Sequence, residues 1–241
     1  MERDTKCPGV VINTVRAREN DRLITLLTTD RGLVEAYVYG ARKSVRSVKA
    51  PLYTEGVFSL YQKGENGKIS LKDVDVISTH ESIAESLDRS LSAALLSELV
   101  LRGRFHEASL YKLYAEALDA LESESSDKVV SLFILHYLML SGLSGDYREC
   151  PNCLRSYHDE EVLGFSHSLG VAVCSECDTM KGELILPKNA RLYAARALEL
   201  PFGDALKLGI SQEQIQRIAG YLKRCLRHSF PAHLNTLDMG Y

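Results

Sequence analysis

The sequence predicts an α+β protein of several domains, in which a small β-rich head precedes an all-α part. Residues 1–77 alternate apolar and polar side chains as strands do, and later residues place apolar side chains at helical spacing. Two Cys-x-x-Cys pairs interrupt the helical part. The chain has 241 residues, enough for one large domain or two to three small ones. We expect four segments, which are 1–77, 78–147, 148–182 and 183–241.

Five strands are expected in the β-rich head. Turn-forming stretches separate them, among them Thr29–Gly32 and Gly64–Gly67. The first expected strand opens with Val10–Ile12, and the others are Leu23–Leu27, Leu33–Tyr39, Val57–Tyr61 and Ile69–Ile77. Short strands at this spacing, without a helix of comparable length, predict a small antiparallel barrel or sandwich. A five-stranded OB-type barrel is one economical solution.

At Ser78 the apolar period changes from that of a strand to that of a helix. Ser78 and Glu81 match a capping box, so we expect the first helix to begin at Ser78 and to end at Gly103. Further helices are expected over 110–121, 127–143, 189–198 and from Ser211 onward. The last of these begins with a second capping box and carries four cations, Arg217, Lys223, Arg224 and Arg227, which suit either a solvated face or an acidic partner.

The two cysteine pairs have the spacing of a tetrahedral zinc site. Two thiolates separated by two residues bind one metal from a tight turn, and twenty residues lie between the pairs as a loop or short hairpin. Redox or disulfide pairs are the alternative, but they need a βαβ context or an oxidising compartment. We therefore expect one structural Zn²⁺, held by Cys150, Cys153, Cys174 and Cys177. Cys7 and Cys225 are expected to be small buried residues.

Composition and missing motifs narrow the class of protein. No apolar run approaches the ~20 residues that cross a bilayer, and the charged N-terminus does not resemble a secretory signal. A cytoplasmic protein is expected. The sequence has no Walker loop, dinucleotide fingerprint, HExxH helix or nucleophile elbow, which favours a protein that is not an enzyme. A metalloenzyme in which His158 or His167 replaces a cysteine is the less favoured reading.

A basic segment follows the third strand. Residues 1–77 carry thirteen Lys and Arg against ten Asp and Glu, although the whole chain has a net charge of −3. Four of these cations lie in Gly40–Lys49, and in an OB barrel such cations neutralise phosphates while aromatic rings stack on bases. The nearby aromatic residues are Tyr37, Tyr39, Tyr53, Phe58 and Tyr61. A solvated loop, with the aromatic rings in the core or at the barrel rim, fits equally well.

The chain as a whole resembles the bacterial RecO family. The resemblance lies in a strand ending in Val15, Asn20–Thr28, Gly32 and Gly40–Ser44, together with the position of the four cysteines. It covers nearly the full length, and implies an OB head and a helical body with an inserted zinc module. Leu154 and Asp178 stand where some zinc modules have glycine. The tail 231–241 has little that can be matched.

The resemblance also implies a function. RecO proteins are DNA repair and recombination mediators that bind single- and double-stranded DNA and anneal complementary strands. With RecR they help load RecA onto strands coated with single-strand-binding protein, whose acidic C-terminal tail the helical body engages. Such a protein is cytoplasmic and associated with the nucleoid. We assign phosphate contacts to Arg42, Lys43, Arg46 and Lys49, and as second candidates to Arg16, Arg18 and Arg22. A zinc-containing protein-interaction adaptor that does not bind DNA is the alternative.

Overall fold

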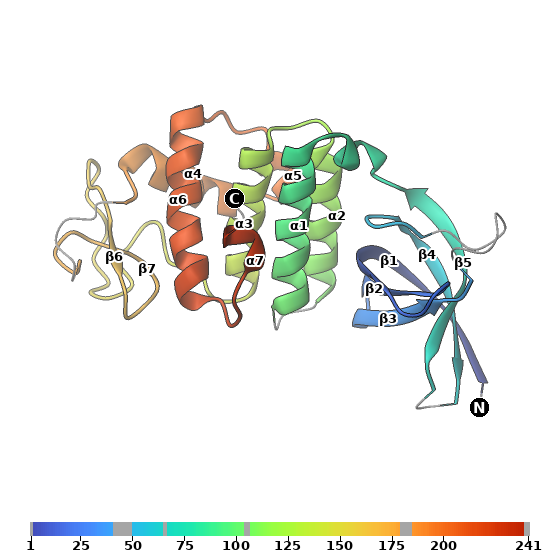
Figure 1. Cartoon of the computed structure of the whole chain (residues 1–241). Coiled ribbons are helices and arrows are strands. Elements are labelled where there is room, and N and C mark those ends of the chain that lie inside the picture. The colour runs from blue at the N-terminus through green and yellow to red at the C-terminus, as the bar shows by residue number, and fades with distance from the viewer. Residues whose placement is uncertain (1, 41–49, 65–66, 104–106, 179–184, 239–241) are drawn as a thin grey trace. The chain divides into compact units, whose positions relative to one another are not determined.

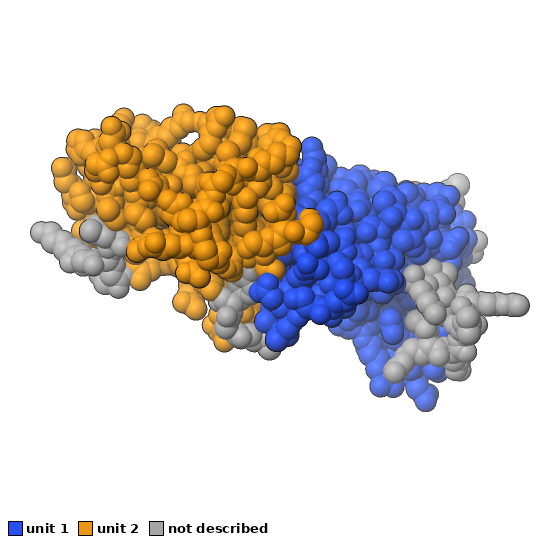
Figure 2. Space-filling model, turned by 90° about the horizontal axis from the view of Figure 1, so that it is seen from above, with its two compact units in different colours: residues 1–93, 97–122 blue, residues 94–96, 123–241 orange. Residues whose placement is uncertain are grey.

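The computed structural model describes residues 2–40, 50–64, 67–103, 107–178 and 185–238. It divides into two compact units, which are treated separately below (Figure 2). The first unit comprises residues 1–93 and 97–122, and the second comprises residues 94–96 and 123–241. A five-stranded N-terminal sheet followed by helices is confirmed. Among the described residues, no helix combines the length and apolar character needed to cross a bilayer.

The first unit begins with five strands that close into a barrel (Figure 1). They are β1 (Glu2–Arg16), β2 (Arg22–Thr28), β3 (Gly32–Val38), β4 (Glu55–Lys63) and β5 (Ile69–Ser78), in the order β1-β2-β3-β5-β4. The first half of β1 pairs with β4 and its second half with β2, all antiparallel, whereas β3 and β5 are parallel at Tyr37 and Ser70. Alternate residues such as Ile24, Ala36 and Leu60 fill the barrel core.

β1 begins well before Val10, where the first strand was expected to open. Its first residues are polar, and Pro8 and Gly9 lie in its middle, so it has no strand-like apolar pattern there. Pairing along the whole of β4, from Glu2 opposite Lys63 to Val10 opposite Glu55, nevertheless keeps this segment extended. Main-chain hydrogen bonding, which the side-chain pattern does not report, sets the length of this strand.

The first helix begins later than expected. Ser78 still pairs with Glu55 in the sheet, and His80 has a left-handed backbone with φ 48°. A capping box at Ser78 is therefore wrong, because a helix cannot continue through these two residues. A 3₁₀ turn, η1 (Glu81–Glu85), leads to Ser86, whose hydroxyl caps α1 (Leu87–Arg102) by accepting from Arg89 N. Gly103 ends α1 as expected, and α2 (Ala108–Leu121) follows.

The second unit is built mainly from helices. They are α3 (Ser126–Leu140), α4 (Lys188–Leu198), α5 (Phe202–Ala205), α6 (Gln212–Ser229) and α7 (Asn235–Asp238). α3 is buried nearly all round and packs against α6 and α4. The capping box at Ser211 and Gln214 is present at the start of α6. A short hairpin of β6 (Gly164–Ser166) and β7 (Val171–Val173) lies between the cysteine pairs.

Candidate metal centre and candidate nucleic-acid interface

Four cysteine thiols converge in the second unit. The Sγ atoms of Cys150, Cys153, Cys174 and Cys177 all lie within 4.8 Å of one another. Those of Cys153 and Cys174 are 3.7 Å apart. A tetrahedral zinc with Zn–S bonds of about 2.3 Å places its sulfurs about 3.8 Å apart. The chain thus brings together a donor set with the identity and spacing of a four-thiolate metal site, and neither of the described residues His158 and His167 joins it.

Each cysteine pair lies on a tight turn closed by a main-chain hydrogen bond. Leu154 N donates to the carbonyl oxygen of Cys150 at 2.8 Å, and Asp178 N donates to that of Cys174 at 3.0 Å. Burial would raise the pKa of the Cys150 thiol, but backbone N–H donors, foremost that of Cys174, outweigh it and lower the pKa to about 7. A thiol tuned in this way readily becomes the thiolate that binds metal.

The residues that follow the two pairs differ in their environment. Leu154 has φ 59°, a left-handed conformation that favours glycine, and its side chain is 73% exposed. Asp178 is buried instead, against Gly164, where an added Cβ would lie 2.4 Å from its carboxyl carbon. Only the first of these two turns therefore holds a bulky residue where the backbone favours glycine.

An ion pair that the sequence did not reveal joins the two turns. Arg155 binds Glu161 through two hydrogen bonds, of 2.9 and 3.0 Å. Glu161 also accepts from the backbone N and the hydroxyl of Ser175, each at 3.1 Å. The guanidinium of Arg155 is the main reason why the pKa of Glu161 falls to about 2. Because Arg155 follows the first cysteine pair and Ser175 lies inside the second, this carboxylate holds both turns together.

A second arginine anchors the segment 148–182, called the cysteine module below, within the second unit. Arg191 on α4 is buried and donates to the carbonyl oxygens of Tyr147 and His158, each at 3.2 Å. Its guanidinium also lies 5.3 Å from the centroid of the Tyr157 ring. The sequence offered no signal for this role, because Arg191 is more than thirty residues from each of these partners.

The two remaining cysteines match the expectation. Cys7 is buried in the barrel core, and Cys225 is buried on α6. Burial raises the pKa of both thiols, that of Cys225 to about 12. Neither belongs to the thiol cluster.

The cations assigned to phosphate contacts fall into two groups. Arg42, Lys43, Arg46 and Lys49 lie outside the described residues. Arg16, Arg18 and Arg22 are exposed at the hairpin between β1 and β2, where Arg16 is directly opposite Arg22.

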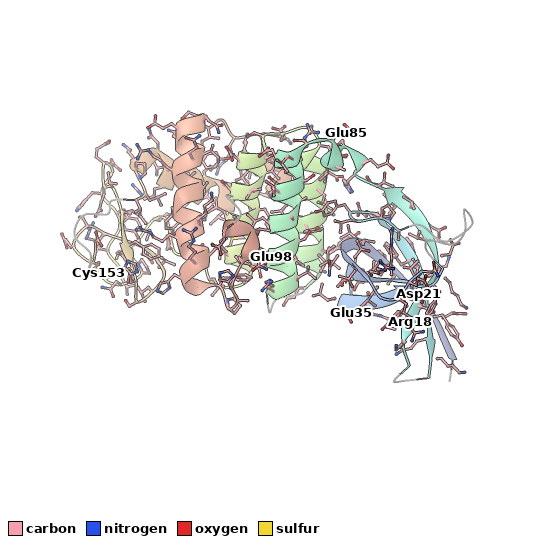
Figure 3. The ribbon with its side chains drawn as sticks, viewed as in Figure 1. Arg18, Asp21, Glu35, Glu85, Glu98 and Cys153 are labelled. Atoms are coloured by element: carbon pink, nitrogen blue, oxygen red, sulfur yellow. The ribbon has the colours of Figure 1, made fainter. Side chains whose placement is uncertain are left out.

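The turn of this hairpin is tied to the end of the third strand. The backbone N–H groups of Ala17 and Arg18 donate to the Asp21 carbonyl oxygen, and the Asp21 carboxylate accepts from Gly40 N at 3.0 Å. Figure 3 shows Arg18 and Asp21 together at this end of the barrel. The hairpin arginines therefore lie beside the residue at which the basic segment begins.

The five aromatic residues near the basic segment separate into two classes. Tyr53 and Phe58 are buried, as expected of core residues. Tyr37 and Tyr61 are half-buried, and Tyr39 is 56% exposed.

Both candidate sites lie in parts of the chain that match models of known protein families. A family model described as "Recombination protein O N terminal" matches residues 1–80, and one described as "Recombination protein O C terminal" matches residues 84–238. The chain belongs to the RecO family. The two RecO models meet where β5 ends and the helical segment begins. The resemblance seen in the sequence is thereby confirmed.

Individual RecO proteins are similar over most of their length. The DNA repair protein RecO of Bacillus subtilis is 30% identical over 177 residues, which are 72% of this chain and 68% of that protein. The DNA repair protein RecO of Myxococcus xanthus is 26% identical over 237 residues, which are 95% and 94% of the two chains. That of Dehalococcoides mccartyi is 24% identical over 229 residues, 89% and 86% of the two chains.

Proposed function

We propose that this chain is a recombination mediator in DNA repair that acts by binding rather than by covalent chemistry. It binds single- and double-stranded DNA and anneals complementary strands. With RecR it helps load RecA onto DNA coated with single-strand-binding protein, in the cytoplasm at the nucleoid. The observation that carries this proposal is the match of both RecO models, which together span 1–80 and 84–238.

The barrel is the proposed DNA-binding part and is of the OB type. Closure of five strands in the order β1-β2-β3-β5-β4 supports this assignment. Arg16 and Arg22 also support it, because like charges opposite each other on paired strands repel, at a cost of up to about 1 kcal/mol. A bound phosphate removes this repulsion. The proposed phosphate contacts are Arg42, Lys43, Arg46 and Lys49, with Arg16, Arg18 and Arg22 beside them.

The cysteine module is proposed to be structural. Its four thiols, Cys150, Cys153, Cys174 and Cys177, would hold one Zn²⁺, since four cysteines at this spacing match the Zn²⁺ preference and leave no position for a reacting water. The metal would fasten the loop that carries β6 and β7. The division into an OB domain (1–77), a helical domain (78–147 and 183–241) and a zinc module (148–182) belongs to the same proposal.

The helical part is proposed to bind the acidic C-terminal tail of single-strand-binding protein. Off its apolar stripe, α6 carries Arg217, Lys223, Arg224 and Arg227. A cationic helix face complements an acidic peptide. A zinc-containing interaction adaptor would use such a face too, but it would not need the opposed arginines of the barrel hairpin.

Salt dependence of single-strand affinity tests the barrel assignment. Each phosphate contact contributes about −0.7 to the log–log slope, so joint replacement of Arg42, Lys43 and Arg46 by alanine should reduce its magnitude by about two units. A matched control replaces Lys112, Arg196 and Lys207, which are exposed and distant in sequence from the basic segment. An unchanged slope in the first variant would overturn the assignment. Failure to anneal strands coated with single-strand-binding protein would overturn the mediator role.

A further inference from the structure

A row of residues crosses the outside of the barrel from β3 to β4. Tyr37 on β3 is opposite Ser70 on β5, and Ser70 is opposite Tyr61 on β4. Opposite residues of paired strands point to the same face of a sheet. The neighbouring residues along the strands, such as Val38 and Leu71, lie in the barrel core. The two tyrosines and Ser70 therefore share the outer surface.

Two lysines flank this row. Lys68 directly precedes β5, and Lys72 lies at a register shift within β5, so their contacts with the tyrosine rings, rather than strand alternation, place them beside the row. Lys68 Nζ lies 4.7 Å from the centroid of the Tyr37 ring, and Lys72 Nζ lies 4.7 Å from that of Tyr61. Each of these two rings thus has an ammonium group over it, and Lys72 Nζ also pairs with Asp4 Oδ1 at 2.6 Å.

A third tyrosine extends the row toward the arginine hairpin. The ring of Tyr39 stacks on that of Tyr37, with centroids 5.9 Å apart and planes inclined by 12°. Tyr37 already contacts a ring and a cation, whereas Tyr39 leaves more than half of its surface in solvent. Tyr39 also directly precedes Gly40, which is bonded to Asp21. The exposed ring therefore lies at the end of the barrel that carries Arg18.

We propose that Tyr37, Tyr39 and Tyr61, with Lys68 and Lys72, form a stacking platform for the bases of single-stranded nucleic acid. This tyrosine platform deepens the proposed function and rests on it. Aromatic rings stack on the unpaired bases of a single strand with little sequence preference, while cations beside them neutralise the backbone. A duplex keeps its bases stacked inside, so the platform favours single strands.

Substitution of the exposed ring tests the platform. Tyr39→Ala should weaken binding of oligothymidylate about tenfold, since stacking of one base on an aromatic ring contributes about 1–3 kcal/mol. The log–log salt slope should not change, because no charge is removed. Tyr39→Phe keeps the ring and should bind as the unaltered chain does. Tyr39→Leu keeps only apolar bulk and should bind as Tyr39→Ala does.

The DNA ligand supplies the matched control. An abasic strand of the same length has the phosphates without the bases, so Tyr39→Ala should not alter its binding. Binding to a duplex should likewise be unaffected by Tyr39→Ala. A loss of affinity for all three ligands would indicate a damaged barrel and would overturn the platform.

Fluorescence gives a direct readout of contact. The chain has no tryptophan, so Tyr39→Trp places a single reporter on the platform. Oligothymidylate should quench its emission, and the abasic strand should not. Leu87→Trp, at a position on α1 that is 77% exposed, is the control and should not be quenched.

The outcomes separate this inference from the proposed function. If the chain binds oligothymidylate in a salt-dependent manner, and Tyr39→Ala binds equally well, the tyrosine platform is wrong and the DNA-binding function stands. If the unaltered chain does not bind single strands at all, both fail. Loss of affinity confined to base-containing single strands supports both.

Discussion

His80 and Asp119, 39 residues apart, are joined by a 2.9 Å contact between Nε2 and Oδ1. The other ring nitrogen of His80 lies 2.8 Å from the carbonyl oxygen of Tyr53. Both His80 and Tyr53 have left-handed backbones, with φ of 48° and 67°. One buried imidazole thus links a strained residue ahead of β4, its own strained position after β5, and α2. Such outliers persist only where the surroundings fix them.

Replacing His80 should therefore unfold the first unit more easily. His80→Ala leaves the buried carbonyl of Tyr53 without its donor and opens a cavity, so the free energy of unfolding in urea should fall by about 3 kcal/mol. Asp119→Asn is the matched control. The Asp119 side chain is 66% exposed and an amide can still hydrogen-bond to Nε2, so the cost should stay below about 1 kcal/mol. Equal losses in the two variants would contradict the assigned role of the Tyr53 carbonyl.

Metal content and thiol reactivity should distinguish the six cysteines. The purified chain should contain about one zinc per molecule, and a chelator at neutral pH should release it. Iodoacetamide should then modify four thiols. Cys7 and Cys225 should react only after unfolding, because burial raises their pKa and the thiolate is the reacting form. Mass spectrometry of peptides counts the modified positions, and rapid labelling of all six before unfolding would contradict the assignment.

The buried thiol of Cys225 should make the chain less stable in alkali. Its pKa rises from an ordinary 9.0 to about 12 on folding, so between these values only the unfolded state loses the proton. This contribution to stability is fully present below pH 9 and is lost as pH rises toward 12. At pH 10.5 the loss is about 2 kcal/mol, from 1.36 kcal/mol per pKa unit.

The measurement compares urea unfolding at pH 8 and pH 10.5 for the unaltered chain and for Cys225→Ala. Buried tyrosines titrate in both, so only the difference between the two chains reports on Cys225. The unaltered chain should lose about 2 kcal/mol more than the variant. An equal loss in both would show that the thiol ionises as readily in the folded state as in the unfolded one.

Replacing Leu154 by glycine should stabilise the cysteine module. A left-handed backbone costs a residue with a Cβ about 1–2 kcal/mol, and the exposed leucine side chain gains little from packing. Leu154→Gly should therefore raise the free energy of unfolding by about 1 kcal/mol after the greater chain entropy of glycine is counted. Gly209→Ala, at a position with open space and no positive φ, is a control expected to change little. Destabilisation by Leu154→Gly would show that the leucine makes a contact of its own.

Local patterns in the sequence predicted what depends on local structure. The cysteine pairs, the hairpin between them and the capping box at Ser211 are set by residues a few positions apart. The wrong helix start at Ser78 shows the limit, because the competing pairing with Glu55 joins residues far apart in the sequence. A local rule cannot weigh a non-local partner.

The site residues that sequence patterns did not predict also depend on partners that only the fold brings together. Arg155 and Glu161 are residue types that are common in exposed loops. Only the folded turn brings Ser175 to the same carboxylate. The five aromatic residues lie near the basic segment in the sequence, but alternation along the strands places Tyr37 outward and Phe58 in the core. The position of each residue in this alternation, rather than its type, makes the distinction.

The double pairing of β1 has a consequence for aggregation. Closure leaves none of the five described strands as an edge, since the first residues of β1 cover the last residues of β4. Removal of Glu2–Lys6 would leave Ser59–Lys63 with an uncovered row of main-chain donors and acceptors. An uncovered strand of this kind is a template for pairing with another molecule. A polar segment with no place in the hydrophobic core thus covers the main-chain groups through which sheets of separate copies would otherwise pair.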